Sequence, residues 1–145
     1  MKLTIFADGG ARGNPGPASV GVLILKNGTN FAEISQKIGV ATNNVAEYRA
    51  LARALEEAVK ICHQVKLGSK EKVEFIEVFM DSQLVIRQVT GQYKIKNQVL
   101  AAILAAILQL EKKLPKIKYN LIEREKNRQA DRLVNLALDQ EADNR

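Results

Sequence analysis

The stretch FADGGARGNPGPASVGVLIL, from Phe6 to Leu25, decides how the chain begins to fold. Apolar residues alternate up to Asp8, a loop of glycines and prolines follows, and a second apolar segment covers residues 19–25. Alternation with a period of two predicts β-strands over residues 2–8 and 19–25. The acid at the end of the first strand gains nothing evident from the two glycines that follow it. Asp8 is therefore the first candidate for a functional residue.

The rest of the chain predicts an α/β fold with a mixed sheet. Asn27-Gly28 is the best hairpin turn in the sequence, so the next strand should complete an antiparallel meander. A later β-branched strand should start a parallel portion. Further strands are predicted over residues 31–40, 73–80 and 117–122, helices over 42–64, 82–91, 97–114 and 127–143, and a loop over 67–70. The order β-β-β-α-β-α-α-β-α predicts a five-stranded mixed sheet flanked by helices.

Two of the predicted helices carry apolar faces. In the helix over residues 42–64, one stripe should face the core, and it consists of Val45, Tyr48, Ala52, Leu55, Val59 and Cys62. The helix over residues 97–114 has too broad an apolar face for a solvent-exposed position. Most of its large side chains should pack against the sheet, namely Ile103, Leu104, Ile107, Leu108 and Leu110. A self-association patch on this helix stays open as an alternative.

The composition indicates one globular domain over residues 1–145. The chain is 46% hydrophobic and 26% charged, which suits a single core. Its net charge of +6 favours an acidic partner such as nucleic acid, although solubility explains it equally well. The single cysteine, Cys62, suits a reducing compartment, and the longest apolar stretch is too short to span a bilayer. We therefore expect a cytoplasmic monomer with no signal peptide and no membrane partner.

Four acids from distant parts of the chain stand where predicted elements begin or end: Asp8, Glu47, Asp81 and Asp131. Three of them also have a local explanation. Glu47 could close a capping box that starts at Asn44, Asp81 could belong to a helix cap, and Asp131 could favour a helix dipole. If the acids meet, their repulsion requires divalent cations, and hard oxygen ligands select Mg²⁺ or Mn²⁺.

The sequence around these acids resembles type 1 ribonuclease H. The resemblance rests on four stretches that occur in the family's order: ADGGARGNPGPA (7–18), TNNVAEYRAL (42–51), FMDSQLVIRQVTGQYKIKN (79–97) and REKNRQADRLVNLAL (124–138). Each stretch holds one of the acids, and the predicted order of strands and helices also matches. The resemblance covers nearly the whole chain and implies a ribonuclease H-like fold.

The resemblance implies an endoribonuclease that hydrolyses the RNA strand of RNA–DNA hybrids and leaves 5′-phosphate and 3′-hydroxyl ends. The four acids would be its catalytic and metal-binding residues, and they would hold two Mg²⁺ or Mn²⁺ ions. By this match Asp8 would bridge both ions. Glu47 and Asp81 would complete the site, and Asp131 would bind mainly the second ion.

The resemblance also implies residues that bind the substrate. Asn14 and Gln83 resemble minor-groove readers of the hybrid, and Asn44 is expected to share base-edge contact. Thr42 and Asn43 match a pocket that grips a phosphate of the DNA strand. The start of a helix should offer free backbone N–H groups there.

Two further segments complete the predicted substrate contacts. The glycine-rich loop, with Gly9 and Gly10, should let the backbone approach the substrate without a Cβ clash. Lys94 and Lys96 form, with Tyr93, a candidate contact strip for the DNA backbone. A solvated loop is the alternative explanation of this strip.

The chain departs from the family pattern in two places. Many members carry a histidine in the loop before the last acid, whereas this loop contains Arg124 and Glu125, and the only histidine of the chain is His63. Arg124 or Glu125 could take over part of that role. The basic handle of some bacterial members is also missing. Some members of this compact branch cleave double-stranded RNA, which leaves that substrate open as a second partner.

Two other functions stay open. One is a hybrid-binding or double-stranded-RNA-binding module with weak or no catalysis, and the presence of all four acids argues against it. The other is another nuclease of the same fold, such as a resolvase or an integrase core. The contexts Asp81-Ser82-Gln83 and Asn14-Pro15-Gly16 argue against this second alternative.

Overall fold

The computed structural model describes residues 1–64 and 72–143, with only the backbone described for residues 141–143. The elements within these residues are β1 (Lys2–Ala11), β2 (Gly16–Lys26), β3 (Thr29–Ala41), α1 (Asn43–Gln64), β4 (Phe75–Met80), α2 (Gln83–Val89), α3 (Gln98–Glu111), β5 (Ile117–Leu121), the 3₁₀ helix η1 (Arg124–Lys126) and α4 (Arg128–Asp143). The predicted order of strands and α-helices is confirmed. The loop predicted over residues 67–70 lies outside the described residues.

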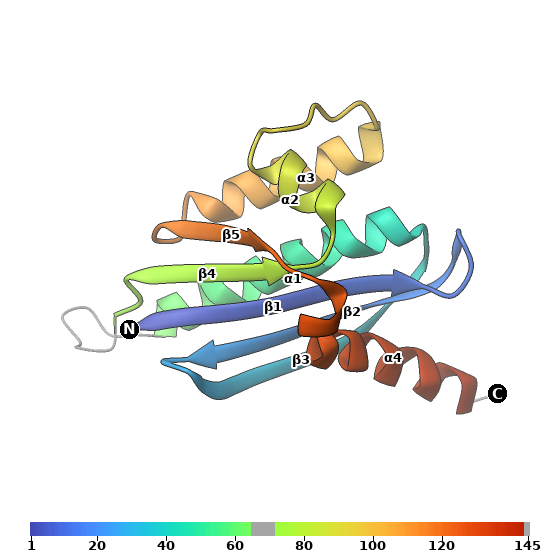
Figure 1. Ribbon diagram of the computed structural model, residues 1–145, viewed down its shortest axis with the longest axis horizontal. Helices are drawn as coiled ribbons and strands as arrows, with labels where there is room; N and C mark the ends of the chain where they lie inside the picture. Colours follow the sequence, from blue (N-terminus) through green and yellow to red (C-terminus); the bar gives the residue numbers. More distant parts are fainter. Residues whose placement is uncertain (65–71, 144–145) are drawn as a thin grey trace.

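The strands form one five-stranded sheet in the order β3-β2-β1-β4-β5, with β1 at its centre (Figure 1). β1, β2 and β3 pair antiparallel, whereas β4 pairs parallel with both β1 and β5. The β2–β3 hairpin turns at Asn27 and Gly28, whose φ angles of 49° and 81° are both positive, as a type I′ turn requires. The predicted mixed sheet is therefore confirmed.

The central strand β1 extends past its predicted end at Asp8. Its ladder with β2 continues through Asp8, which pairs with Gly21, and reaches Ala11. Its ladder with β4 stops at Phe6, because β4 ends at Met80. The prediction that Asp8 ends a strand is wrong. Asp8 lies where β1 extends beyond the end of its parallel neighbour β4, so no described strand pairs with that side of the residue.

Helix α1 covers one face of the sheet, and its buried face differs from the predicted stripe. Half of the buried side chains are alanines, and the buried set is Ala46, Tyr48, Ala50, Leu51, Ala54, Leu55, Ala58 and Ile61. Four members of the predicted stripe are only partly buried: Val45, Ala52, Val59 and Cys62. The stripe is wrong for these four because α1 lies so close to β1 that alanines fill the contact.

Helix α3 packs mainly on α1 (Figure 1). Its buried side chains are Leu100 and Ile107, whereas Leu108 remains 42% exposed. The prediction that this helix packs against the sheet is wrong, because α1 already covers that face. The helix also ends at Glu111, before its predicted end at residue 114. None of the helices in residues 1–64 and 72–143 combines the length and apolarity that crossing a membrane requires.

Helix α4 rests on β1, β2 and β3 (Figure 1). Two strand hydroxyls anchor it: Ser19 Oγ donates to the carbonyl of Val134 at 2.6 Å, and Ser35 Oγ donates to the carbonyl of Leu133 at 2.5 Å. Gly21 lies directly beneath the helix, because a Cβ at this position would stand 2.3 Å from the carbonyl oxygen of residue 130. The sheet accepts α4 at this distance only because residue 21 has no side chain.

Gly9 likewise lets α1 approach the other face of the sheet, because it has no side chain. A Cβ there would stand 2.1 Å from the carbonyl oxygen of Ala46 and 2.6 Å from the backbone nitrogen of Glu47. The next residue, Gly10, faces α4, where a Cβ would meet Val134 Cγ1 at 3.3 Å. Because successive residues of a strand face opposite sides, α1 and α4 lie on opposite faces. Both helices thus touch strand backbone close to Asp8.

We expect Gly21→Ala to lower the free energy of unfolding by about 2–4 kcal/mol, because the new methyl group would overlap backbone atoms of α4. Gly10→Ala is the matched control on the same face. Its methyl group would press only on one side-chain carbon of Val134, so the cost should stay below about 1 kcal/mol. Urea denaturation of both variants measures the difference. Equal losses would show that α4 does not rest on residue 21.

Candidate active site

The four predicted acids line one cavity of about 270 Å³. Asp8 projects from β1 and Glu47 from near the start of α1, while Asp81 follows β4 and Asp131 lies in the first turn of α4. Other residues that line the cavity include Arg12, Asn43, Arg124 and Asn135. Acids from four separate parts of the sequence therefore share one space.

The carboxyl group of Asp8 resists ionisation. Burial of its carboxyl group and the nearby charges of Asp81, Asp131 and Glu47, in that order, raise its pKa to about 8. A hydrogen bond of 3.0 Å from the Gly9 N–H to Oδ1 opposes this shift without cancelling it. Burial and the neighbouring acids together keep the Asp8 carboxyl group largely protonated at neutral pH.

Glu47 is oriented by Asn43 and Ser82. Asn43 Nδ2 donates to Glu47 Oε1 at 2.7 Å, and a side-chain hydrogen bond with Ser82 lowers the Glu47 pKa. Burial is the larger effect, and together with the charge of Asp81 it raises the pKa overall. Glu47 therefore resists ionisation, as Asp8 does, while its carboxylate is held in a fixed direction.

The caps of α1 and α2 come from hydroxyl residues rather than from the acids. Thr42 Oγ1 accepts from the Val45 N–H at 3.2 Å, so the capping box predicted from Asn44 to Glu47 is wrong. Ser82 caps α2 through its side chain, so Asp81 does not. Neither Glu47 nor Asp81 is used for helix capping, which leaves both carboxyl groups to the cavity.

Two asparagines that the sequence analysis does not single out for this purpose contact the remaining acids. Asn127 is 1% exposed, and its Nδ2 donates to Asp81 Oδ1 at 2.7 Å and to the carbonyl of Ala7 at 3.0 Å. Asn135 Nδ2 lies 3.4 Å from Asp131 Oδ2. The sequence feature that could have identified them is their spacing, because each lies about one helical turn from Asp131, one before it and one after it. Taken alone, the first of them indicates only the start of a helix.

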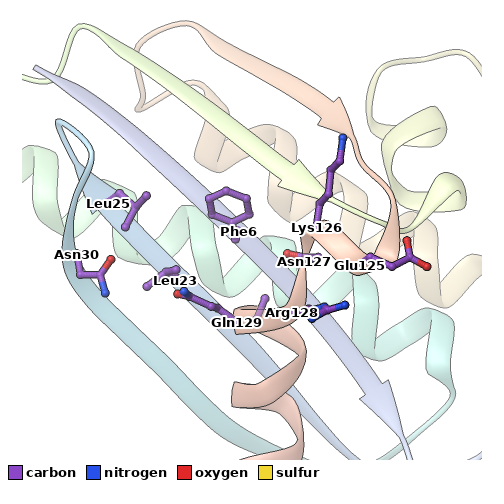
Figure 2. Close-up of a pocket in the computed structure, with 10 residues that line it drawn as sticks. Phe6, Leu23, Leu25, Asn30, Glu125, Lys126, Asn127, Arg128 and Gln129 are labelled. Carbon is purple, nitrogen blue, oxygen red and sulfur yellow. The ribbon is translucent and has the colours of Figure 1, made fainter.

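Asn127 also borders a second, larger hollow of about 390 Å³. Figure 2 shows Asn127 near Phe6 of β1, with Leu23 and Leu25 of β2 beside them. The described residues that line this hollow include none of the four acids. The chemistry expected of the acids therefore belongs to the smaller cavity.

Asn14 and Asn43 join the loop after β1 to the start of α1. Asn14 Oδ1 accepts from the Asn43 N–H at 3.0 Å, and Asn43 Oδ1 accepts from the Ala11 N–H at 3.3 Å. Thr42 accepts hydrogen bonds from two further amides of this turn, those of Val45 and Ala46, whereas no described residue accepts from the Asn44 N–H. The prediction of free N–H groups for a phosphate is therefore wrong for Asn43, whose N–H donates to Asn14, and it stays a prediction for Asn44.

The other predicted substrate residues lie at different distances from the acids. Gly9 and Gly10 line the cavity, although their contacts with α1 and α4 already explain why they lack side chains. Gln83 is exposed at the start of α2, and Lys94 and Lys96 are exposed between α2 and α3. The structure does not bring these last three side chains into the cavity.

Arg124 of η1 lines the cavity beside the acids. Glu125 borders the larger hollow instead. His63 is exposed near the C-terminal end of α1, whereas Glu47 lies near its start. Of the two candidates for the role of the missing loop histidine, Arg124 is therefore the one that stands next to the carboxylates.

The donor set of the cavity fits a hard divalent cation. Its acidic members offer carboxylate oxygens, and the charges of three of them add to burial in raising the pKa of Asp8, so a cation would relieve their repulsion. Among the residues that the structure describes, no three His, Cys, Asp or Glu side chains already form a coordinating group. Cation binding would therefore draw the carboxylates together and release the proton held by Asp8.

Known proteins resemble this chain over almost its whole length. Residues 6–137 match the model of a protein family described as reverse transcriptase-like. The ribonuclease HI of Halobacterium salinarum is 38% identical over 139 residues, which cover 95% of this chain and 65% of that protein. The chain belongs to the type 1 ribonuclease H family.

Solved structures of this ribonuclease H family share the fold closely. LC11-RNase H1, solved in complex with an RNA/DNA hybrid, is 43% identical with a TM-score of 0.85, over 97% of this chain and 99% of that one. The bifunctional protein Rv2228c of Mycobacterium tuberculosis is 43% identical over 141 residues, or 96% of this chain. The match covers 36% of Rv2228c, so the chain spans about a third of the length of the first curated relatives it matches.

Asp8→Asn should stabilise the metal-free protein, because the amide replaces a carboxyl group that burial and its acidic neighbours keep from ionising. The folded pKa of about 8 lies above the unfolded value of 3.8, so wild type is most stable below pH 3.8 with respect to this group and loses that stability as the pH rises to about 8. The variant should gain on the order of 2 kcal/mol near pH 8 and much less near pH 4.5.

Thermal denaturation in excess EDTA at both pH values measures this gain. Glu56→Gln, an exposed position on α1, is the matched control and should show no gain that grows with pH. An Asp8→Asn variant that is equally or less stable than wild type near pH 8 would contradict the electrostatic account of the cavity.

Proposed function

We propose that this chain is a metal-dependent endoribonuclease that hydrolyses the RNA strand of RNA–DNA hybrids and leaves 5′-phosphate and 3′-hydroxyl ends. The observation that carries the proposal is the single cavity shared by Asp8, Glu47, Asp81 and Asp131. The related RNase H1 solved with a hybrid supports the same substrate class. We propose the same activity for any longer protein that contains this chain.

Ribonucleases H depend as a family on divalent metal ions, and we propose that the four acids hold two Mg²⁺ or Mn²⁺ ions here. Such ions, when bound, activate a water molecule and stabilise the charge that develops on the phosphate. Asp8 must first give up the proton that its high pKa retains. The other carboxylates are oriented by neighbouring side chains.

Three asparagines and one serine prepare the site by fixing carboxylate directions. Asn43 and Ser82 hold Glu47, Asn127 holds Asp81 and Asn135 lies against Asp131. Because these partners donate through short side chains, they restrict the directions that the carboxylates can take before a cation draws them together. Arg124 adds a positive charge at the rim, where it would attract the scissile phosphate.

Recognition of the hybrid is expected to combine the minor groove with the phosphate backbone. Asn14 commits its Oδ1 to the Asn43 N–H, so its Nδ2 remains as a donor for minor-groove acceptors, which occur in every base pair. This donor would read the groove without sequence preference. We also propose that Gln83 contacts the groove, and that the 2′-hydroxyl group distinguishes the RNA strand from DNA.

We still propose that the first turn of α1 binds the substrate, although fewer of its backbone N–H groups are available than the sequence predicts. Thr42, Asn43 and Asn44 remain the proposed grip on a DNA phosphate, and the Asn44 N–H is the backbone donor still available among the described residues of that turn. We further propose that residues 1–145 act as one monomeric domain in the cytoplasm. The half-buried thiol of Cys62 suits that reducing compartment.

The decisive experiment end-labels each strand of a hybrid in turn and adds the protein with Mg²⁺ or Mn²⁺. Wild type should cut only the RNA strand, and Asp8→Asn should lower kcat by at least about 100-fold. Calorimetric titration with Mn²⁺ should show weaker binding by the variant, which separates loss of the metal from other defects. Glu56→Gln should behave as wild type.

Other outcomes of this assay correspond to the alternative functions. Tight binding of the hybrid without cuts in either metal would indicate a binding module. Cuts in branched DNA but not in the hybrid would indicate another nuclease of this fold. Cuts in double-stranded RNA at a comparable rate would extend the substrate class beyond hybrids.

The double variant Lys94→Ala/Lys96→Ala should raise KM for the hybrid and leave kcat nearly unchanged, because both lysines are exposed outside the cavity. Removing a lysine that binds a phosphate should reduce the slope of log KM against log salt concentration by about 1. Lys60→Ala, an exposed lysine near the end of α1, is the control. An unchanged salt slope would remove these two lysines from the substrate interface.

A further inference from the structure

A chain of hydrogen bonds runs from the core of α1 to the connection between α2 and α3. Tyr48 is fully buried, and its hydroxyl group donates to Gln88 Oε1 on α2. Gln88 Nε2 in turn donates to the backbone carbonyl of Lys94 at 3.2 Å. A buried hydroxyl group on one helix is thus linked, through one amide side chain, to the backbone beside an exposed lysine.

The connection is attached to the end of α2 by further contacts. The backbone N–H groups of Gln92 and Tyr93 both donate to the carbonyl of Arg87, at 2.8 and 3.0 Å. The Arg87 guanidinium group donates to Gln92 Oε1 at 2.6 Å and lies 5.7 Å from the centre of the Tyr93 ring. The position of this connection is therefore set by the position of α2.

Helix α2 is fixed to α1 at both of its ends. It has only 7 residues, which is too short for a helix to hold its position by itself. At its start, Ser82 bonds to Glu47, and near its end Gln88 bonds to Tyr48. Glu47 and Tyr48 are consecutive, so one turn of α1 carries both an acid of the cavity and the anchor of α2.

The side chains at the far end of this chain of bonds are available to a ligand. Lys94 and Lys96 are exposed, and neither forms an ion pair with any described residue. In Figure 1 the α2–α3 connection lies on one side of the β1 and β4 strand ends and α4 lies on the other. The connection can thus contact a duplex that reaches beyond the cavity.

We propose that Tyr48 and Gln88 are positioning residues that set the place of Lys94 and Lys96 relative to the carboxylates, so that the lysines meet backbone phosphates of the bound duplex. This inference rests on the proposed function, because it assumes that the cavity and the lysines bind the same nucleic acid. Burial raises the Tyr48 pKa to about 12, so its hydroxyl group stays a neutral donor across the physiological range. The link would therefore not switch with pH.

The test compares Tyr48→Phe with Tyr119→Phe. Each change removes one hydroxyl group and keeps the ring. Tyr119 on β5 donates to Glu111, at the opposite end of α3 from the lysine connection, so its loss probes stability alone. The measurements are Tm, steady-state cleavage of the hybrid, and fluorescence-anisotropy binding of a labelled hybrid in Ca²⁺, all over a series of salt concentrations.

Tyr48→Phe should raise KM and the hybrid Kd about three- to tenfold, with kcat changed less than about twofold and a salt slope lower by about 1. Tyr119→Phe should leave all of these at the wild-type values, even where its Tm falls as far. Gln88→Met, which removes both bonds of the link, should match Tyr48→Phe. Equal KM, Kd and salt slope for the two tyrosine variants would overturn the proposal.

A double-mutant cycle separates positioning from a general loss of stability. The increase in Kd caused by Lys94→Ala/Lys96→Ala should be at least about threefold smaller in the Tyr48→Phe background than in wild type. Fully independent effects would also overturn the proposal. If wild type binds the hybrid without cutting it, the proposed function fails while the Kd comparison still decides this inference.

Discussion

The cavity that the four acids share depends on backbone-to-backbone contact at two glycines. Gly9 follows Asp8 along β1 and allows α1 to approach, and Gly21 lies opposite Asp8 on β2 and allows α4 to approach. Glu47 and Asp131 each stand next to the helix residue that touches a glycine. A side chain at either strand position would push one helix outward and take its acid away from Asp8. The shape of the backbone, more than any attraction among side chains, assembles the acids.

This assembly opposes the stability of the fold. Burial and mutual repulsion raise the pKa values of Asp8 and Glu47, so the protein without a cation holds carboxyl groups that resist ionisation. Hydrogen bonds from Asn43, Ser82 and Asn127 offset part of this cost without cancelling the excess charge. Such a cavity is prepared to bind positive charge, which is the property that a metal-dependent phosphodiesterase requires.

Much of this could be predicted from the sequence, and the failures share a cause. Period-two alternation, the Asn27-Gly28 turn and the order of elements predicted the sheet. The acids were found because the sequence placed them at predicted element boundaries, although Asp8 lies inside β1. The errors concern how closely elements approach one another: the alanine face of α1, the docking of α3 on α1 and the length of β1 beyond Asp8. The amides of α1 that are already satisfied by Asn14 and Thr42, and the support from Asn127, likewise depend on contacts between distant segments. Local pattern does not encode such distances.

The hydrogen bonds of Asn43 restrict which amino acids its position can tolerate. Its amide group donates to Glu47, its carbonyl oxygen accepts from Ala11, and its own backbone N–H is taken by Asn14. Aspartate would set a second negative charge against Glu47, and glutamine would carry the amide too far. Alanine would leave the Ala11 N–H without its acceptor and Glu47 with Ser82 as its remaining partner. Neutral drift at this position is therefore restricted by internal chemistry, before any demand from a bound duplex is considered.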